Sequence, residues 1–332
     1  MFHEYSFFIN GDKDRIFLHG KCTFAVMENA RAYNDFGSFL RGVFPFKVQK
    51  ISIDAGFTCP NRDGRVGVNG CTYCNNQTFN PDYCKTDKSI RQQLEEGKAF
   101  FGRKYPDMKY LAYFQAYTNT YGSLSELKMK YEEALAVDGV VGLVIGTRPD
   151  CVSPALLDYL ATLARQTFLV VEYGIECAND ATLRLINRGH DFECSRRAIE
   201  ETAERGIRTG GHIIVGLPGE DAEESLRQAD IISALPLTML KIHQMQVVKG
   251  TALERMFAEK PFHVYTVEEY VRLIAEYVQR LRWSLVLERF VSQSPKEMLI
   301  APQWGLKNHE FADLLDKHMR AIGARQGAKH AE

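Results

Sequence analysis

The sequence predicts an α/β fold in which repeated βα units surround a parallel β-sheet. Six strand-like segments recur between about residues 48 and 250, and roughly 10 to 25 residues of helical pattern separate each from the next. Several segments are apolar throughout, which is expected of strands buried on both faces of a parallel sheet. At 332 residues and 45% hydrophobic content, the chain can also bury a large core.

The strands are predicted from alternation and from runs of β-branched residues. Residues 48–55 alternate between apolar and polar side chains, whereas residues 140–145 form a continuous apolar run. The strands are expected at residues 48–55, 110–117, 140–145, 168–174, 207–217 and 239–248.

Helices are predicted where apolar residues recur at helical spacing behind a capping residue. Asp87 is expected to cap a helix over about residues 90–101. Further helices are expected after the capping-box sequences Ser123-x-x-Glu126 and Thr266-x-x-Glu269, after Ser153-Pro154, and around residues 183–186, 195–205 and 226–232.

Three regions are expected along the chain. Residues 1–31 show no sustained periodicity and are predicted to form a peripheral N-terminal arm, within which Met27 is an alternative start. Residues 32–250 carry the βα units. Residues 251–332 are predicted to form a helical extension packed on the sheet, with one further strand near residues 285–290. The last dozen or so residues have the composition of a frayed tail.

Composition narrows the setting in which the protein works. The formal net charge is -1, so nucleic-acid binding would need a local basic patch. No apolar run approaches the roughly 20 residues of a membrane span, and the N-terminus lacks the apolar core of a signal peptide. A cytoplasmic location without membrane association is expected. In that reducing compartment, clustered cysteines indicate metal or redox chemistry rather than disulfide bonds.

Three of the eight cysteines, Cys59, Cys71 and Cys74, fall in one glycine-rich segment after the first predicted strand. Thiolates are soft ligands that select zinc, copper(I) or iron-sulfur clusters. Structural zinc sites and ordinary clusters use four protein ligands, whereas a [4Fe-4S] cluster held by three cysteines keeps one iron free. Cys84 would complete a four-thiolate zinc site. A zinc-stabilised α/β binding protein without catalysis is therefore the alternative.

Polar residues follow the predicted strands at their carboxyl ends, where ligands bind in parallel α/β folds. Six loops are therefore expected to converge on one site. Each candidate also has a structural alternative, such as an ion pair between Arg148 and Asp150. Beyond the cysteines, the candidates are Gln115, Thr118, Thr147, Arg148, Glu176, the turn at 216–219, His243 and Gln246.

Several sequence segments, taken together and in this order, match those of a known enzyme family. They are GFTCPNRDG and GCTYC at 56–74, YFQAYTNT at 113–120, GTRPDC at 146–151, INRGHDF at 186–192, HIIVGLPGE at 212–220, KIHQMQVVKGT at 241–251, and LIAPQW at 299–304. With them the chain resembles radical S-adenosylmethionine (SAM) enzymes, and most closely the YhcC-like group of bacterial iron-sulfur oxidoreductases. Eleven residues separate Cys59 from Cys71, where three are common. The longer loop is typical of this group and of the related radical SAM domain in the catalytic subunit of Elongator.

The resemblance implies a partial (β/α)6 barrel of the TIM type at residues 32–250, and it assigns roles to residues. Cys59, Cys71 and Cys74 would ligate a [4Fe-4S] cluster whose fourth iron binds the amino and carboxylate groups of SAM. The other SAM contacts would be Tyr73 near the adenine, Gln115, Ala116 and Tyr117 at the amino group, Thr147, Arg148 and Glu176 at the ribose and carboxylate, and Ile214 to Gly216 at the adenine edge.

The resemblance also implies a reaction. A one-electron donor such as flavodoxin or ferredoxin would reduce the cluster, and reductive cleavage of SAM would give methionine and a 5′-deoxyadenosyl radical that abstracts hydrogen from a substrate. A small metabolite and an RNA base are both open as substrates. The Elongator-like similarity and a group of local basic residues suggest RNA, but a solvated helix face is the preferred explanation of those basic residues. Those basic residues are Arg184, Arg188, Arg196 and Arg197.

Overall fold

The computed structural model describes residues 30–75, 81–103, 105 and 107–330. Residues Ala32–Glu332 form one compact unit, and the description below concerns that unit. The predicted N-terminal arm and the alternative start at Met27 lie outside the described residues, apart from residues 30 and 31. Among the described helices, none is long and apolar enough to cross a membrane.

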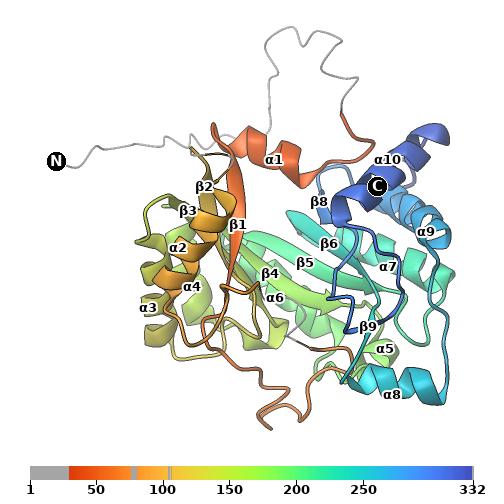
Figure 1. Ribbon diagram of the computed structural model, residues 1–332, viewed down its shortest axis with the longest axis horizontal. Helices are drawn as coiled ribbons and strands as arrows, with labels where there is room; N and C mark the ends of the chain where they lie inside the picture. Colours follow the sequence, from red (N-terminus) through yellow and green to blue (C-terminus); the bar gives the residue numbers. More distant parts are fainter. Residues whose placement is uncertain (1–29, 76–80, 104, 106, 331–332) are drawn as a thin grey trace, which may run out of the picture. The chain divides into compact units, whose positions relative to one another are not determined.

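Seven parallel strands form one sheet, in the order β1-β2-β3-β4-β5-β6-β8. The sheet curls into an open, partial barrel (Figure 1), which confirms the predicted fold class. Successive strands are neighbours, as expected for repeated βα units. The strands are β1 (Val48–Ile53), β2 (Lys109–Phe114), β3 (Val140–Thr147), β4 (Phe168–Glu176), β5 (Arg208–Val215), β6 (Met239–Gln244) and β8 (Val286–Arg289).

The sheet differs from the prediction at its last strands. The segment predicted as one strand at 239–248 is divided, because only β6 continues the sheet. The following β7 (Val247–Val248) pairs antiparallel with β9 (Leu299–Ala301) in a separate two-stranded sheet. The strand predicted near 285–290 is β8, and it pairs with β6 as the seventh strand.

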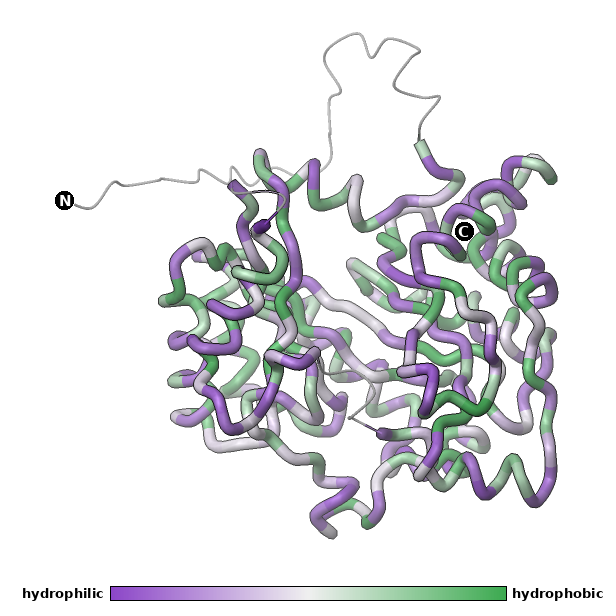
Figure 2. The backbone as a smooth tube through the Cα atoms, in the orientation of Figure 1, coloured by the Kyte–Doolittle hydropathy of each residue, from purple (hydrophilic) through white to green (hydrophobic). Residues whose placement is uncertain are grey.

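Most helices pack on the outer face of the sheet and on one another (Figure 1), and α1 is an exception described below. Their hydropathy alternates along the chain (Figure 2), as expected of helices with one buried face. The largest apolar cluster lies between these helices and the sheet. The helices are α1 (Phe36–Val43), α2 (Ile90–Phe101), α3 (Leu124–Leu135), η3 (Pro149–Cys151), α4 (Pro154–Ala164), α5 (Asp180–Leu185), α6 (Phe192–Glu204), α7 (Ala222–Ala234), α8 (Ala252–Glu259), α9 (Val267–Arg280) and α10 (Asn308–Ala321).

Most of the predicted helix caps are present. Ser123, Ser153 and Thr266 cap α3, α4 and α9. The predicted cap at Asp87 is wrong, because Ser89 caps α2. Its side chain accepts a hydrogen bond from the backbone N–H of Gln92, and the Gln92 side chain accepts one from the backbone N–H of Ser89, which completes a capping box.

Helix α1 closes the barrel interior at the amino ends of the strands. Phe36, Phe39 and Leu40 of α1 pack against an apolar layer on the inner face of the sheet. In Figure 1, α1 lies at the end of the sheet opposite to the loop that follows β1. Any ligand in the barrel therefore binds toward the carboxyl ends of the strands. The apolar layer includes Leu111, Val144, Val170, Met239 and Val286.

The chain after α10 is folded against the rest of the unit, so the predicted frayed tail is wrong for the described residues up to 330. Gln326 is 2% exposed. Its side chain donates to the carbonyl oxygens of Arg282 and Leu285 and accepts a hydrogen bond from the backbone N–H of Asn34. These bonds tie the end of the chain to segments that enter α1 and β8.

Candidate active site

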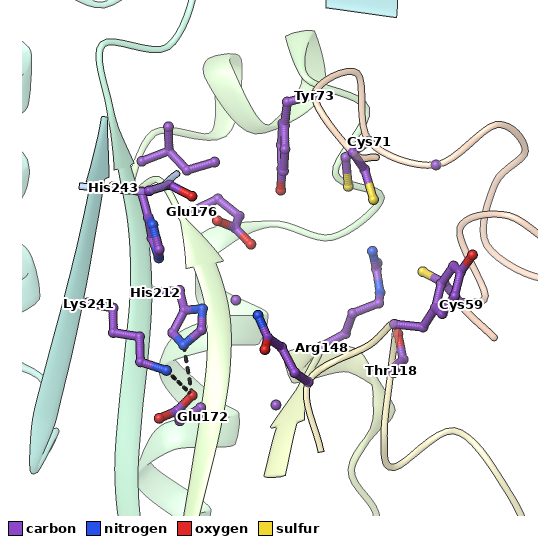
Figure 3. A pocket seen from close by; sticks show the side chains of 18 of the residues that line it. Cys59, Cys71, Tyr73, Thr118, Arg148, Glu172, Glu176, His212, Lys241 and His243 are labelled. Atoms are coloured by element: carbon purple, nitrogen blue, oxygen red, sulfur yellow. Dashed lines mark hydrogen bonds and ion pairs between the residues drawn. The ribbon is translucent and has the colours of Figure 1, made fainter. Parts of the chain in front are cut away.

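A cavity of about 250 Å³ lies where the carboxyl ends of the parallel strands meet. Figure 3 shows side chains from several strands and loops pointing into it. Thr118, His243 and Gln246 also line this cavity. Of the residues that the resemblance assigned to the cluster or to SAM, those lining the cavity are Cys59, Cys71, Tyr73, Cys74, Gln115, Ala116, Tyr117, Thr147, Arg148, Glu176 and Ile214.

The loop after β1 places Cys59, Cys71 and Cys74 along the cavity. Backbone hydrogen bonds from Arg62 to Cys59 (2.8 Å) and from Cys74 to Cys71 (3.0 Å) fold the two ends of this loop. The Arg62 guanidinium donates to the carbonyl oxygen of Cys74 at 2.9 Å. Gly70 has a φ of +75°, and a Cβ there would lie 2.9 Å from Arg62 Nε, so this position requires glycine.

Two hydrogen-bond donors face the sulfur of Cys71. Asn61 Nδ2 lies 3.6 Å and Arg188 Nη1 lies 3.5 Å from Cys71 Sγ. Such donors suit the negative charge that a metal-bound cysteine sulfur carries. Among the described residues, no three histidine, cysteine or carboxylate side chains are already arranged around a common metal position. The three cysteines therefore share one cavity without forming a closed site.

Cys84, the candidate fourth thiolate, lies away from this cavity. It is 3% exposed and belongs to the apolar core cluster together with Tyr83 and Ile90. Burial, reinforced by the nearby Asp54 carboxylate, raises the pKa of the Cys84 thiol to about 12, so it is neutral. Within the described part of the chain, the structure thus does not assemble the four-thiolate zinc site.

Arg188 is buried in the cavity wall, although the sequence reasoning did not assign it to the site. Its Nη2 donates to the carbonyl oxygen of Gly174 at 2.6 Å and lies 3.8 Å from Glu176 Oε1. Its Nε has no hydrogen-bond partner among the described residues. The signal in the sequence is that Asn187 and Gly189, two residue types typical of turns, flank Arg188. Both adopt a positive φ, +53° and +80°.

Arg148 both pairs with a carboxylate and lines the cavity. Its Nε and Nη2 each lie 2.8 Å from an oxygen of Asp150, which is the ion pair considered as its structural alternative. Its Nη1 is buried without a hydrogen-bond partner in the described structure. The neighbouring Thr147 hydroxyl lies 2.6 Å from the hydroxyl of Thr120. Arg148 thus keeps one donor for a ligand.

Residues 115–117 form a loop, because β2 ends at Phe114 and not at residue 117 as predicted. Ser52 donates to Gln115 Oε1 at 2.7 Å, which anchors the amide side chain to β1. Tyr117 has a φ of +61° and is 39% exposed. The strand end and the turn bring the backbone of these three residues to the cavity.

Strand β4 extends through Glu176, whereas a loop was predicted from residue 175. The apolar Ile175 is fully buried and continues the strand, and the chain turns at Glu176, whose φ is +65°. Figure 3 shows Glu176 and Tyr73 facing the same part of the pocket. Burial, with Cys71 and Glu176 adding to it, raises the pKa of the Tyr73 hydroxyl well above 10, so it stays neutral.

Of the segment assigned to the adenine edge, Val215 and Gly216 do not line the cavity. Gly216 has a φ of +88°, and a Cβ there would lie 3.1 Å from the ring of Tyr265. Gly216 therefore serves the turn after β5, while Ile214, two residues earlier on the same face, lines the cavity.

Charged residues also lie deeper in the barrel, one layer above the apolar residues that contact α1. Inward-facing positions repeat every second residue, so Glu172 follows Val170 and Lys241 follows Met239. Glu172 is 1% exposed, and its carboxylate lies 2.8 Å from Lys50 Nζ, 2.6 Å from Lys241 Nζ and 3.0 Å from His212 Nε2. We call this set the inner polar layer: Lys50, Tyr113, Glu172, His212, Lys241 and Glu288.

The sequence reasoning missed the inner polar layer. A signal was present, because Glu172 and Lys241 each stand among apolar residues of a predicted strand, where an unpaired charge would be costly. Only the neighbouring His243 was singled out.

The four arginines considered for RNA binding differ in exposure and in pairing. Arg188 is buried in the cavity, and Arg196 forms ion pairs with Glu193 and Glu200. Arg184 and Arg197 remain exposed. The described structure therefore provides two exposed arginines here and not a basic patch of four.

Comparisons with known proteins agree with this architecture. The family model described as Radical SAM superfamily matches residues 62–228, and the model described as Radical_SAM C-terminal domain matches residues 237–321. YtqA of Bacillus subtilis is 35% identical over 92% of this chain and 94% of that protein. YhcC of Escherichia coli is 34% identical over 91% of this chain and 97% of that protein.

One solved structure shares the fold. Elp3 of the archaeon Methanocaldococcus infernus, lacking its N-terminal residues 1–46, superimposes with a TM-score of 0.63. The match covers 85% of this chain and 64% of that one, at 19% identity. Together with the family models, these similarities establish that the chain belongs to the radical SAM superfamily, whose members are enzymes that use a [4Fe-4S] cluster and SAM.

Proposed function

We propose that Cys59, Cys71 and Cys74 hold a [4Fe-4S] cluster and that the enzyme uses it to cleave SAM reductively. The observation that carries this proposal is that three thiols from one loop line a single cavity, while Cys84 lies in the core. The donors that face Cys71 suit an anionic cluster sulfur. A site with three protein thiolates leaves one iron for SAM.

The residues around the cysteines suit the groups that SAM presents. Its carboxylate would accept hydrogen bonds from Arg148 Nη1 and Arg188 Nε, which among the described residues that line the cavity are the two buried donors without a partner. Glu176 and Thr147 suit the ribose hydroxyls. The neutral ring of Tyr73 suits the adenine face, with Ile214 at its edge and the backbone of residues 115–117 at the amino group.

When bound and reduced by an external donor such as flavodoxin or ferredoxin, the cluster supplies the electron that breaks the C5′–S bond of SAM, and the resulting 5′-deoxyadenosyl radical abstracts hydrogen from substrate. The chain itself orients SAM and keeps water from the reacting atoms. The apolar layer over α1 closes the inner end of the barrel, which limits access to one side.

Anaerobic reconstitution with iron and sulfide tests this function. We expect about four iron and four sulfide per chain, and 5′-deoxyadenosine from SAM and dithionite. Cys71→Ala should abolish both. Cys84→Ala is the matched control and should retain both, because that thiol packs in the core. Cleavage that survives Cys71→Ala, or a colourless protein that holds one zinc ion, would contradict the assignment.

A small metabolite is the favoured substrate class. Of the arginines that would have supported RNA binding, Arg188 lies in the cavity wall and Arg196 is paired with two glutamates at the surface, which leaves Arg184 and Arg197. We expect no tight RNA binding even at low salt. An affinity for RNA that falls steeply with rising salt concentration would reverse this preference.

A further inference from the structure

We infer that the inner end of the cavity binds the substrate through a carboxylate or phosphate group held by Arg289 beside His243, so that the substrate is a small organic anion. This inference rests on the proposed function and specifies its substrate class. It follows from the charges, the geometry and the size of the inner end.

The first step is the charge balance of the inner polar layer. Lys50 Nζ lies 2.8 Å from oxygens of both Glu172 and Glu288. Lys241 Nζ lies 2.6 Å from Glu172 and 3.4 Å from Glu288. Two lysines and two glutamates therefore neutralise one another. Neither carboxylate is left to pair with a further cation.

Arg289 is that further cation. It lines the cavity and is the cross-strand partner of Lys241 in the pairing of β6 with β8. Like charges at such positions destabilise a sheet. In the part of the chain that the structure describes, Arg289 makes no hydrogen bond or ion pair. A partly buried guanidinium without a counter-ion is costly, and an anionic ligand would remove that cost.

His243 adds a second donor, because it follows Lys241, the cross-strand partner of Arg289, on the same face of β6. Its ring lies beside that of His212, with centroids 5.7 Å apart, and both line the cavity. Burial, with contributions from His212, Arg289 and Lys241, lowers the pKa of His243 well below 6.5. The imidazole is therefore neutral and can donate one N–H to an anion. The only facing carboxylate, among the described groups that influence it, is Glu172, which the two lysines already neutralise.

The size of the inner end argues for a small molecule. The whole cavity measures about 250 Å³, which is small for a ligand site, and it must also hold SAM. The apolar layer over α1 closes it below. A base turned out of RNA into this closed end would present no phosphate to Arg289.

The same geometry places the substrate relative to the cysteines. In Figure 3, Lys241, His212 and Glu172 lie at the end of the pocket opposite to Tyr73 and Cys71. An anionic group anchored at the inner end leaves the rest of the molecule pointing toward the cysteine loop. The carbon–hydrogen bond that reacts would then lie between the two ends of the cavity.

Calorimetric titration of the full chain with succinate and with inorganic phosphate, at constant ionic strength in chloride buffer, tests the inference. Both the cluster-loaded and the cluster-free protein are titrated. We expect saturable binding of at least one anion that weakens about tenfold or more in Arg289→Gln, since a charge-assisted hydrogen bond is lost. Arg289→Lys keeps the charge and should lie between the wild type and Arg289→Gln. The control Arg197→Gln removes an exposed arginine and should bind like the wild type.

The outcomes separate this inference from the proposed function. Binding that is absent, or equal in Arg289→Gln and the wild type, overturns the anion site even if SAM is cleaved. Arg289-dependent binding of RNA without binding of either small anion overturns the small-molecule assignment. Arg289-dependent binding of a small anion supports the site. If the wild type binds the anion but does not cleave SAM, the result counts against the proposed function alone. Circular dichroism of each variant ensures that only folded protein is compared.

Discussion

Lys241 Nζ lies 2.6 Å from Glu172 Oε2 inside the barrel, where the two side chains are 5% and 1% exposed. Removing both charges from water is expensive, and their attraction offsets that expense only while every charge is paired. Lys50, Glu288 and His212 complete the pairing. The inner polar layer therefore contributes a defined set of charges at the base of the cavity, and it makes the fold sensitive to the loss of any member.

Glu172→Gln should destabilise the protein by roughly 3 kcal/mol at pH 7, because it leaves two buried lysines with one carboxylate between them. Urea unfolding followed by circular dichroism measures the change. Glu193→Gln, which breaks an exposed ion pair with Arg196, should leave the unfolding midpoint unchanged. Equal midpoints for the two variants would show that the inner polar layer does not stabilise the fold.

The same carboxylate should give the wild type a steeper loss of stability in acid. Burial alone would raise the pKa of Glu172, but Lys241, Lys50 and His212 outweigh it and hold the pKa well below the ordinary value of 4.5. Ionised Glu172 thus stabilises the fold above about pH 4.5, and this stability is lost as the pH falls toward the folded-state pKa.

Below pH 4.5 the wild type should lose up to about 1.4 kcal/mol per pH unit more than Glu172→Gln, which corresponds to one extra proton bound on unfolding. Urea titrations at pH 6, 5, 4 and 3.5 measure the two slopes. Parallel slopes would mean that the pKa of Glu172 is not depressed in the folded state.

Arg188 should be a positioning residue for the cluster, since it acts through the sulfur of Cys71 and through Glu176. Arg188→Gln should retain iron about 10- to 100-fold less tightly against a chelator, as is usual when a partner of a metal ligand is lost. The reduction potential of the cluster in this variant should also shift, because a positive charge beside the cluster is removed. Arg188→Lys should restore part of both, and the exposed Arg184→Gln serves as the control. Unchanged retention and potential in Arg188→Gln would exclude this role.

Gly67 should be needed for the shape of the cysteine loop. A Cβ at this position would lie 2.3 Å from Asn61 Oδ1, and Asn61 Nδ2 donates to Asn187 at 2.6 Å and faces Cys71 Sγ. Gly67→Ala should displace Asn61 and reduce the iron bound on reconstitution. Gly42→Ala in α1 meets no atom within 4 Å and should stabilise the protein by about 0.5–1 kcal/mol without changing iron content. Full iron content in Gly67→Ala would show that the loop tolerates the movement.

Local patterns were enough to predict the parallel sheet and the convergence of the strand ends. Hydrophobic periodicity fixes which residues enter each strand, and parallel pairing fixes where the strand ends meet. Hydrophobic periodicity does not predict the features that depend on contacts between residues far apart in the sequence. Glu172 and Lys241 are explained by their pairing inside the barrel, although 69 residues separate them along the chain. Arg188 was assigned to a surface because a helix face and a buried turn look alike in sequence.

The prediction of a frayed C-terminal tail was also wrong because tertiary contacts decide the structure there. These contacts provide a further testable prediction. The glycine, lysine and glutamine near residue 326 are typical of a tail. The buried Gln326 side chain nevertheless forms hydrogen bonds with backbone groups of Asn34, Arg282 and Leu285. Gln326→Ala would leave these backbone groups without their partner. Each buried unsatisfied group costs about 1–3 kcal/mol, so we expect a loss of about 3 kcal/mol in unfolding free energy.

Urea unfolding of Gln326→Ala against Lys329→Ala tests this prediction. The Lys329 side chain pairs with Glu276 at the surface, where both are about half exposed, so its loss should have little effect. Gln326 reaches the segment before α1 and the segment before β8, and α1 and β8 close the barrel at its amino end and at its last strand. The variant should therefore also weaken binding of anions near Arg289 on β8. A wild-type unfolding midpoint in Gln326→Ala would show that the C-terminal segment packs on the barrel without stabilising it.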